Sequence, residues 1–272
     1  MEEQRISIMG CGWLGLPLAR ELVRLDCLVK GSTTQIEKCA LLREYGIQPF
    51  CIRATEHLQG ENIDEFFQSD LLILNIPPGR KRADVLSYHV QQKIKNILER
   101  ALANGLKKLM FISSTSVYGN VNDTVTEADL PQPTRPSGMA LLKIEHWLKE
   151  QAIELSILRM AGLAGGNRKA GRFLAGKKDV ANGEAPVNMI HRDDAVAIIL
   201  QVILQKKWGE TFNCCADKHP SRKAFYTAQA KKQDFEAPSF LDESPTEFKI
   251  IANRKVKEVL NYSFLHPDPM AF

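Results

Sequence analysis

The chain has 272 residues, of which 44% are hydrophobic and 25% charged, and its formal net charge is +4. This composition is typical of an ordinary soluble globular protein and excludes a disordered, collagen-like or disulfide-scaffold class. The basic residues are scattered in short groups such as Arg80-Lys81-Arg82, which favours solvated helix ends over a nucleic-acid surface. The length suits one large α/β domain, alone or with a smaller appendage.

The sequence contains neither a membrane-span pattern nor a metal-ligand motif. Its longest apolar stretch, Ile6–Ala19, is interrupted by three glycines and a proline and follows Glu2-Glu3, so we expect no anchor and no signal peptide. The six cysteines form no CxxC pair and have no histidine at zinc-finger spacing, which predicts no metal site. Free thiols are typical of the reducing cytoplasm, and we expect a cytoplasmic location.

Taken in chain order, the first 160 residues alternate short β-rich runs with longer helical runs. The pattern predicts strands at Arg5–Met9, Cys27–Gly31, Ile47–Arg53, Leu71–Ile76 and Lys108–Ser113, and helices at Leu14–Leu25 and Val85–Ala103. Runs such as LLILNI and KLMFIS are apolar without alternation, as expected for parallel strands covered on both faces. This βαβ order predicts a doubly wound parallel sheet of the Rossmann type.

A helix at Gly138–Glu150 and a strand at Leu155–Met160 are expected to extend the same sheet. After Ala161 the segment AGLAGGNRKAGR is rich in glycine and basic residues. Further helices are expected at Asp194–Gln205, Lys223–Lys232 and Asn253–Leu260, with a strand at residues 211–215. We therefore expect a dinucleotide-binding domain over residues 1–162 and a small C-terminal α/β lobe over residues 163–272, with the chain crossing back to the sheet.

The first glycine-rich segment follows a predicted strand and opens a predicted helix. It has the GxGxxG spacing of dinucleotide-binding turns. The first glycine permits a tight turn, the second lets the backbone approach a pyrophosphate, and the third allows the helix to pack closely on the strand. Free N–H groups at the helix start would meet the anion. The residues expected at the cofactor here are Gly10, Gly12, Trp13, Leu14 and Gly15.

The preference for NAD or NADP depends on the residues about 20 positions after the glycine motif, where an acidic side chain would hold the ribose hydroxyls of NAD. Lys30–Gln35 contains no carboxylate, and Thr33 and Thr34 offer hydroxyls that could donate to a 2′-phosphate. This favours NADP slightly over NAD, with Lys38 and Arg53 as the nearest basic candidates. The alternative, that the segment is only a polar strand end, stays open.

Four further motifs follow in order along the chain. They are FISSTSVYG (Phe111–Gly119), LRMAG (Leu158–Gly162), NMIHRDDA (Asn188–Ala195) and GETFN (Gly209–Asn213). In this order they resemble the extended short-chain dehydrogenase/reductase family, specifically its nucleotide-sugar epimerase/dehydratase group. The C-terminal segment, with Pro220-Ser221-Arg222 and NRKVKEVL, resembles the atypical branch of that family. The resemblance implies an NAD(P) cofactor and a nucleotide-linked sugar or similar small molecule as substrate. It also implies a homodimer through the helices at Val85–Ala103 and Gly138–Glu150.

The resemblance also assigns roles to individual residues. Family members move a hydride between a sugar carbon and the nicotinamide, while a Ser or Thr hydroxyl orients the substrate oxygen. Measured from Val-Tyr-Gly, that hydroxyl falls on Ser114, and Tyr118 is a packing residue of the motif. Thr115 and Ser116 stand where dehydratase members carry acids, which argues against dehydration. Outside the residues named above, the resemblance places at the cofactor Asn75, Pro77, Ser113 and Met160.

The catalytic helix departs from the family pattern of a Tyr followed four residues later by a Lys. In one alignment Ser137 replaces the Tyr and Leu141 replaces the Lys. A shift by two residues recovers Lys143 as the lysine but places Met139 at the Tyr position. Neither alignment supplies a phenol, so no catalytic Tyr is assigned.

Three functions are consistent with these patterns. The first is an NAD(P)-dependent oxidoreductase or epimerase acting on a nucleotide-linked sugar. The second is a non-catalytic NAD(P)-binding sensor or interaction protein, which the missing Tyr and Lys favour. The third, a reductase similar to the ketopantoate reductase group, requires an all-helical second domain that the strand at residues 211–215 does not fit. His89 and His191 are candidate proton donors because imidazole is the side chain that ordinarily titrates near neutral pH, but neither is assigned a catalytic role.

Overall fold

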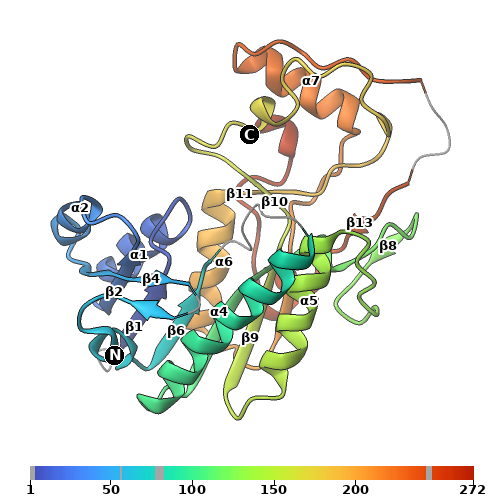
Figure 1. The fold of residues 1–272 in the computed structure, drawn as a ribbon. Coiled ribbons are helices and arrows are strands. Elements are labelled where there is room, and N and C mark those ends of the chain that lie inside the picture. The colour runs from blue at the N-terminus through green and yellow to red at the C-terminus, as the bar shows by residue number, and fades with distance from the viewer. Residues whose placement is uncertain (1–3, 56, 77–82, 243–246) are drawn as a thin grey trace.

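A seven-stranded parallel sheet forms the centre of the protein (Figure 1). The computed structural model describes residues 4–55, 57–76, 83–242 and 247–272, with residues 83–89 described by their backbone alone. The strand order is β12-β9-β7-β6-β1-β2-β3. The bounds of these strands are β1 Arg5–Met9, β2 Leu28–Thr33, β3 Gln48–Cys51, β6 Leu71–Leu74, β7 Lys108–Ser114, β9 Glu154–Met160 and β12 Thr211–Cys214. The predicted doubly wound sheet is confirmed.

Helices cover both faces of this sheet (Figure 1). On one face α4 packs against α5, and on the other α1 packs against α6, which in turn contacts α8. The helix bounds are α1 Gly15–Arg24, α2 Lys38–Glu44, α3 Ile63–Phe67, α4 Ala83–Ala103, α5 Pro136–Lys149, α6 Arg192–Leu204, α7 Arg222–Lys232 and α8 Arg254–Leu260. Gly105 ends the turn after α4 with a φ of 80°, as the predicted glycine stop requires.

Short elements complete the fold. They are the antiparallel pair β4 Arg53–Ala54 and β5 Leu58–Gln59, the parallel pairs β8 Thr124–Val125 with β13 Ile250–Ile251 and β10 Gly162–Ala164 with β11 Met189–His191, and the 3-10 helices η1 Thr115–Val117, η2 Ala170–Phe173 and η3 Pro269–Ala271. The strand predicted at Ile47–Arg53 is therefore divided, because β3 ends at Cys51 and β4 turns away to pair with β5.

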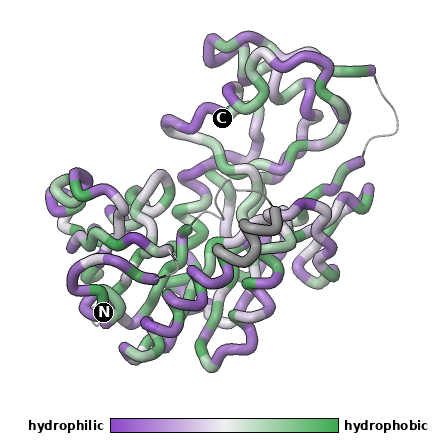
Figure 2. Tube along the Cα trace, in the orientation of Figure 1, coloured by the Kyte–Doolittle hydropathy of each residue, from purple (hydrophilic) through white to green (hydrophobic). Residues whose placement is uncertain are grey.

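The sheet is buried because its central strands are apolar on both sides. All four residues of β6 are fully buried, which explains its uninterrupted apolar run. Figure 2 shows hydrophobic segments on the central strands and frequent hydrophilic segments on the outer loops. Within the described part of the chain, no helix is both long and apolar enough to cross a membrane.

A smaller second lobe lies beyond the carboxyl edge of the sheet, with α7 at the top of Figure 1. It contains α7, η2 and η3, and the β10–β11 pair lies between it and the main body. It has a hydrophobic core of its own, formed by Ala164, Ala170, Val187, Met189 and Phe225. The chain then returns to the main sheet, since β12 pairs with β9. The β10–β11 pair beside this lobe does not match the all-helical second domain that the ketopantoate reductase hypothesis requires.

Candidate functional site

A cavity of about 860 Å³ lies where the carboxyl ends of β1, β2, β6, β7 and β9 meet α4 and α5. This is the edge at which open α/β sheets bind ligands. The residues singled out from the sequence that line it are Gly10, Gly12, Trp13, Leu14, Thr33, Thr34, Asn75, Ser113, Ser114, Ser137, Leu141 and Met160. Two of the residues predicted to contact the cofactor are not in this list: Gly15 is not part of the lining, and Pro77 falls outside the described residues.

The glycine turn between β1 and α1 forms one wall of the cavity. Gly10 has a φ of 108°, and a Cβ there would lie 2.5 Å from the carbonyl oxygen of Asn75. A Cβ on Gly15 would lie 2.2 Å from the carbonyl oxygen of Gly10, so this glycine serves the close packing of α1 on the turn. Among the described residues, no atom lies within 4 Å of a Cβ built on Gly12, which lines the cavity. The backbone of Gly12, the second glycine of the motif, is therefore accessible from the cavity.

The turn is held by hydrogen bonds that leave this space clear. The backbone N–H of Gly10 donates to Ser32 Oγ at 2.9 Å, and the Asn75 side-chain amide donates to the Gly10 carbonyl at 3.1 Å. The N-cap residue Leu14 offers no side-chain cap to α1, and among the described residues the Leu16 N–H donates to the Gly12 carbonyl. An uncapped helix start beside an open glycine fits a pyrophosphate.

At the end of β2 the cavity is polar and carries a cation. Thr33 and Thr34 line it, and Thr33 Oγ1 accepts a hydrogen bond from the backbone N–H of Gln35 at 3.2 Å. Lys38, at the start of α2, lines this part and is exposed. Arg53, the other basic candidate, is not in the lining. Of the two bases near the threonines, the structure therefore brings Lys38 to the cavity.

Ser114 ends β7 and lies in the cavity wall. Its Oγ accepts a hydrogen bond from the backbone N–H of Ser116 at 3.1 Å and so caps η1. The accepted bond fixes the oxygen but leaves the hydroxyl proton free to donate. Ser114 can therefore orient a ligand oxygen.

The face that α5 presents to the cavity decides between the two alignments of the catalytic helix. Ser137 and Leu141 line the cavity, whereas Met139 is 47% exposed and Lys143 is also exposed. Gly138 fixes this face, because a Cβ there would lie 2.1 Å from the carbonyl oxygen of Ser116. The structure thus places Ser137 and Leu141, and not Met139 and Lys143, on the cavity side.

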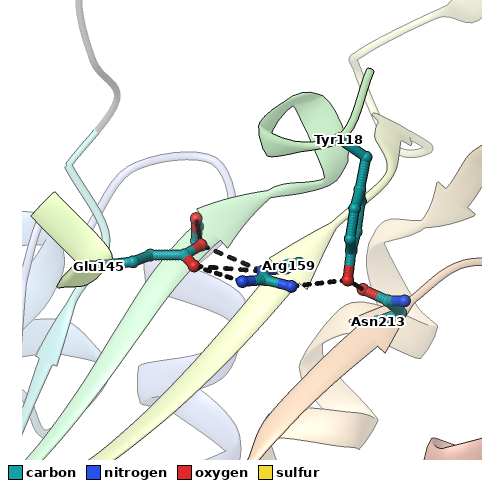
Figure 3. A network of polar contacts seen from close by, with 5 residues as sticks. Tyr118, Glu145, Arg159 and Asn213 are labelled. Atoms are coloured by element: carbon teal, nitrogen blue, oxygen red, sulfur yellow. Dashed lines mark hydrogen bonds and ion pairs between the residues drawn. The ribbon is translucent and has the colours of Figure 1, made fainter. Parts of the chain in front are cut away.

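Behind this wall lies a buried polar network (Figure 3). Arg159 Nη2 donates to Glu145 Oε2 at 2.6 Å, and the two side chains are 3% and 0% exposed. Arg159 Nη1 donates to the Tyr118 hydroxyl at 2.6 Å, and that hydroxyl donates to Asn213 Oδ1 at 2.9 Å. Ser113 donates to Glu145 Oε1, which connects the network to the cavity lining. The network ties β7, α5, β9 and β12 together beneath Ser114.

Tyr118 is a member of this network and not of the cavity lining. Burial raises the pKa of its phenol, against the opposing effects of Arg159 and Asn213. It therefore stays protonated and packed inside the protein, as predicted from its place in the motif.

The charge of the cavity is one-sided. Among the residues that the structure describes, its lining contains the cations Lys38, Lys93 and Arg168 and no Asp, Glu, His or Tyr. None of the three cations forms an ion pair within that part of the chain. Burial raises the pKa of the Cys11 thiol to about 12, so this cysteine adds no negative charge. The arrangement favours a ligand with several negative charges.

Two of these cations were not predicted from the sequence. Arg168 belongs to the glycine-rich and basic segment noted after Ala161, so its composition gave a weak signal. Lys93 lies within the regular pattern of α4, and nothing in the sequence distinguishes it from its exposed neighbour Lys95.

His191 is not in the cavity lining and caps α6, where its Nδ1 accepts from the Asp193 N–H at 3.3 Å. Its ring lies 3.8 Å from that of His266, and donor atoms of His191, Asp193 and His266 lie within 4.8 Å of one another. The Asp193 carboxylate already pairs with Arg192 at 3.3 Å. We assign this cluster no metal. The side chain of His89 falls outside the described residues.

Comparison with known proteins supports the resemblance. A family model described as "NAD dependent epimerase/dehydratase family" matches residues 75–215. Protein YeeZ of Escherichia coli strain K12 is 33% identical over 271 residues, which is 98% of each chain. This protein and YeeZ therefore align over nearly their whole lengths.

Solved structures share the fold. UDP-glucuronic acid 4-epimerase from Bacillus cereus, in complex with NAD, has a TM-score of 0.79 at 19% identity, with 98% of this chain and 94% of that chain covered. UDP-glucose 4-epimerase from Thermotoga maritima, with UDP-glucose, has a TM-score of 0.75 at 17% identity, with 96% and 94% covered. At these identities the likeness is one of fold.

Proposed function

The chain belongs to the NAD-dependent epimerase/dehydratase family, and from that premise we propose that it is an NAD(P)-dependent oxidoreductase or epimerase acting on a nucleotide-linked sugar or similar polyol. The observation that carries the proposal is the cavity at the carboxyl edge of the sheet. Within the described residues it is lined by three cations that form no ion pair, and it opens at Gly12. Both features suit a dinucleotide that carries several phosphate charges.

In this proposal the glycine turn and the uncapped start of α1 hold the pyrophosphate, and Thr33, Thr34 and Lys38 hold the adenosine ribose and its 2′-phosphate. Ser113, Met160 and Leu141 line the opposite end, where the nicotinamide would lie. The bound nicotinamide supplies or accepts a hydride. Ser114 orients the substrate oxygen through its free hydroxyl proton.

A second candidate function is a non-catalytic NAD(P)-binding protein. It is favoured by one observation: within the described residues, the cavity lining has no phenol, imidazole or carboxylate to move a proton. Ser137 stands on the cavity side of α5, and an alcohol transfers protons poorly without a base beside it. Lys93, on the helix packed against α5, is one of the ionisable side chains of the lining that an enzyme could use instead.

Titration with NADPH and NADH, followed by nicotinamide fluorescence, tests the proposal. We expect NADPH to bind more tightly, because Lys38, Thr33 and Thr34 line the same cavity and no carboxylate of the described residues lines it. Lys38→Glu should weaken NADPH about tenfold and leave NADH nearly unchanged, since the new charge would repel the 2′-phosphate. Lys143→Glu, the same change on the exposed side of α5, should have no effect.

Equal affinities for the two cofactors, unaffected by Lys38→Glu, would contradict the preference for NADP. If folded protein bound neither NADPH nor NADH, the proposed function itself would be wrong. Binding without turnover of any nucleotide sugar would favour the non-catalytic candidate.

Ser114→Ala should lower turnover by at least about a hundredfold, the usual effect of removing a catalytic hydrogen-bonding group. The measurement is the nicotinamide absorbance change with whichever nucleotide sugar gives turnover in a screen. Ser116→Ala is the matched control, because Ser116 also lines the cavity but its hydroxyl makes no hydrogen bond within the described residues. Unchanged turnover in Ser114→Ala would remove this residue from the mechanism.

A further inference from the structure

The indole ring of Trp13 lies against two arginines of other segments. The guanidinium carbon of Arg168 is 5.3 Å from the ring centroid, and that of Arg192 is 5.7 Å away. Arg168 also lies 6.0 Å from the ring of Phe173. The Trp13 Nε1 atom is buried and has no hydrogen-bond partner among the described residues. The ring therefore packs against the main hydrophobic core on the inside and contacts the two guanidinium groups.

The loop that carries Arg168 places this side chain against Trp13 of the glycine turn between β1 and α1. Gly165 and Arg168 exchange backbone hydrogen bonds of 3.2 and 3.1 Å, which closes the loop into a tight bend. Gly165 and Gly166 have φ values of 110° and 55°. A Cβ on Gly166 would lie 2.5 Å from Arg192 Nη1, so the loop lies close against this guanidinium. The φ of Gly165 is one that side-chain-bearing residues rarely adopt.

The two arginines differ in their partners and in their access to the cavity. Arg192 pairs with Asp193 at 3.3 Å and is not in the lining. Arg168 lines the cavity and has no carboxylate partner within the described part of the chain. Its guanidinium lies against two aromatic rings, the side chain is exposed, and its N–H groups donate to no acceptor among the described residues. A planar fork of free donors matches the oxygens of a phosphate.

We propose that Arg168 is a phosphate-binding residue which the second lobe contributes to the cavity, with Trp13 as the platform that positions it. The inference rests on the proposed function and extends it, because it assigns a ligand contact to a loop outside the dinucleotide-binding turn. A phosphate at this place belongs either to the pyrophosphate of the dinucleotide or to the diphosphate of a nucleotide-linked substrate. Both have the same chemistry, and the two are distinguished by experiment.

The experiment uses calorimetric titrations of the full chain. One arm measures ADP-ribose and its 2′-phosphate form, which contain the dinucleotide's pyrophosphate without the nicotinamide. The other arm measures UDP in the presence of saturating NADPH. Arg168→Met should weaken one of these ligands by about tenfold or more, and Arg168→Lys should recover part of the loss. Arg172→Met is the matched control, since Arg172 is an exposed arginine of the same segment outside the lining.

A loss confined to the ADP-ribose arm assigns Arg168 to the cofactor, and a loss confined to UDP assigns it to the substrate. Wild-type affinity of Arg168→Met in both arms, while the wild-type protein binds, would overturn the inference and leave the proposed function standing. If the wild-type protein bound none of these ligands, both would be wrong. Arg168→Gln, with its melting temperature measured beside that of the wild type, separates lost binding from lost folding.

Discussion

Gly12→Val is expected to abolish dinucleotide binding, by at least about a hundredfold in affinity, while the protein stays folded. Gly12 lines the cavity, and a Cβ at this position would meet no atom of the described residues within 4 Å. Its φ is also outside the left-handed region that Gly10 occupies, so a side chain causes no backbone strain. The valine would fill the space in which the pyrophosphate has to approach the backbone. NADPH titration measures the loss of affinity, and thermal unfolding shows whether the variant stays folded.

Gly15→Ala provides the contrast within the same turn. A Cβ there would lie 2.2 Å from the Gly10 carbonyl oxygen, so α1 or the turn would have to move. We expect this variant to lose stability, whereas Gly12→Val should melt within a few degrees of the wild type. Normal NADPH affinity in Gly12→Val would show that the pyrophosphate lies elsewhere.

The main elements could be predicted because their sequence patterns are local. The predicted bounds of β1 are the observed ones, and the predicted β7 ends one residue before the observed strand. Both strands are largely apolar runs bounded by polar residues. The glycine turn and Ser114 were found for a similar reason, as their spacing is fixed by the chain itself. All of these residues except Gly15 lie in the cavity lining.

The remainder of the site depends on which side chains tertiary packing turns inward. The sequence could not choose between Ser137 and Met139 on the catalytic helix, and the choice follows from the contact between Gly138 and the Ser116 carbonyl, far apart in sequence. Lys93 and Arg168 reach the cavity from α4 and from the second lobe. No local pattern could predict these positions, because each depends on how separate elements pack.

Glu145→Leu is expected to lower the free energy of unfolding by about 3–5 kcal/mol, the usual cost of leaving a buried charge without its partner. Glu145 is fully buried and accepts hydrogen bonds from Arg159 Nε and Nη2 and from the Ser113 hydroxyl. Without it, the Arg159 guanidinium would remain enclosed at 3% side-chain exposure with Tyr118 as its remaining hydrogen-bond partner. Urea unfolding measures the loss.

Two comparisons give this prediction its control. Asp70→Asn removes a carboxylate that pairs with Arg5 at 2.7 Å, but these side chains are 41% and 52% exposed, so the cost should stay below about 1 kcal/mol. The double variant Glu145→Leu with Arg159→Leu removes both buried charges and should recover much of the stability that Glu145→Leu loses. A loss below about 1 kcal/mol in Glu145→Leu would contradict the network's structural role. A loss of the expected size would show that the ion pair between Glu145 and Arg159 stabilises the part of the cavity wall that contains Ser113, because Ser113 donates directly to Glu145.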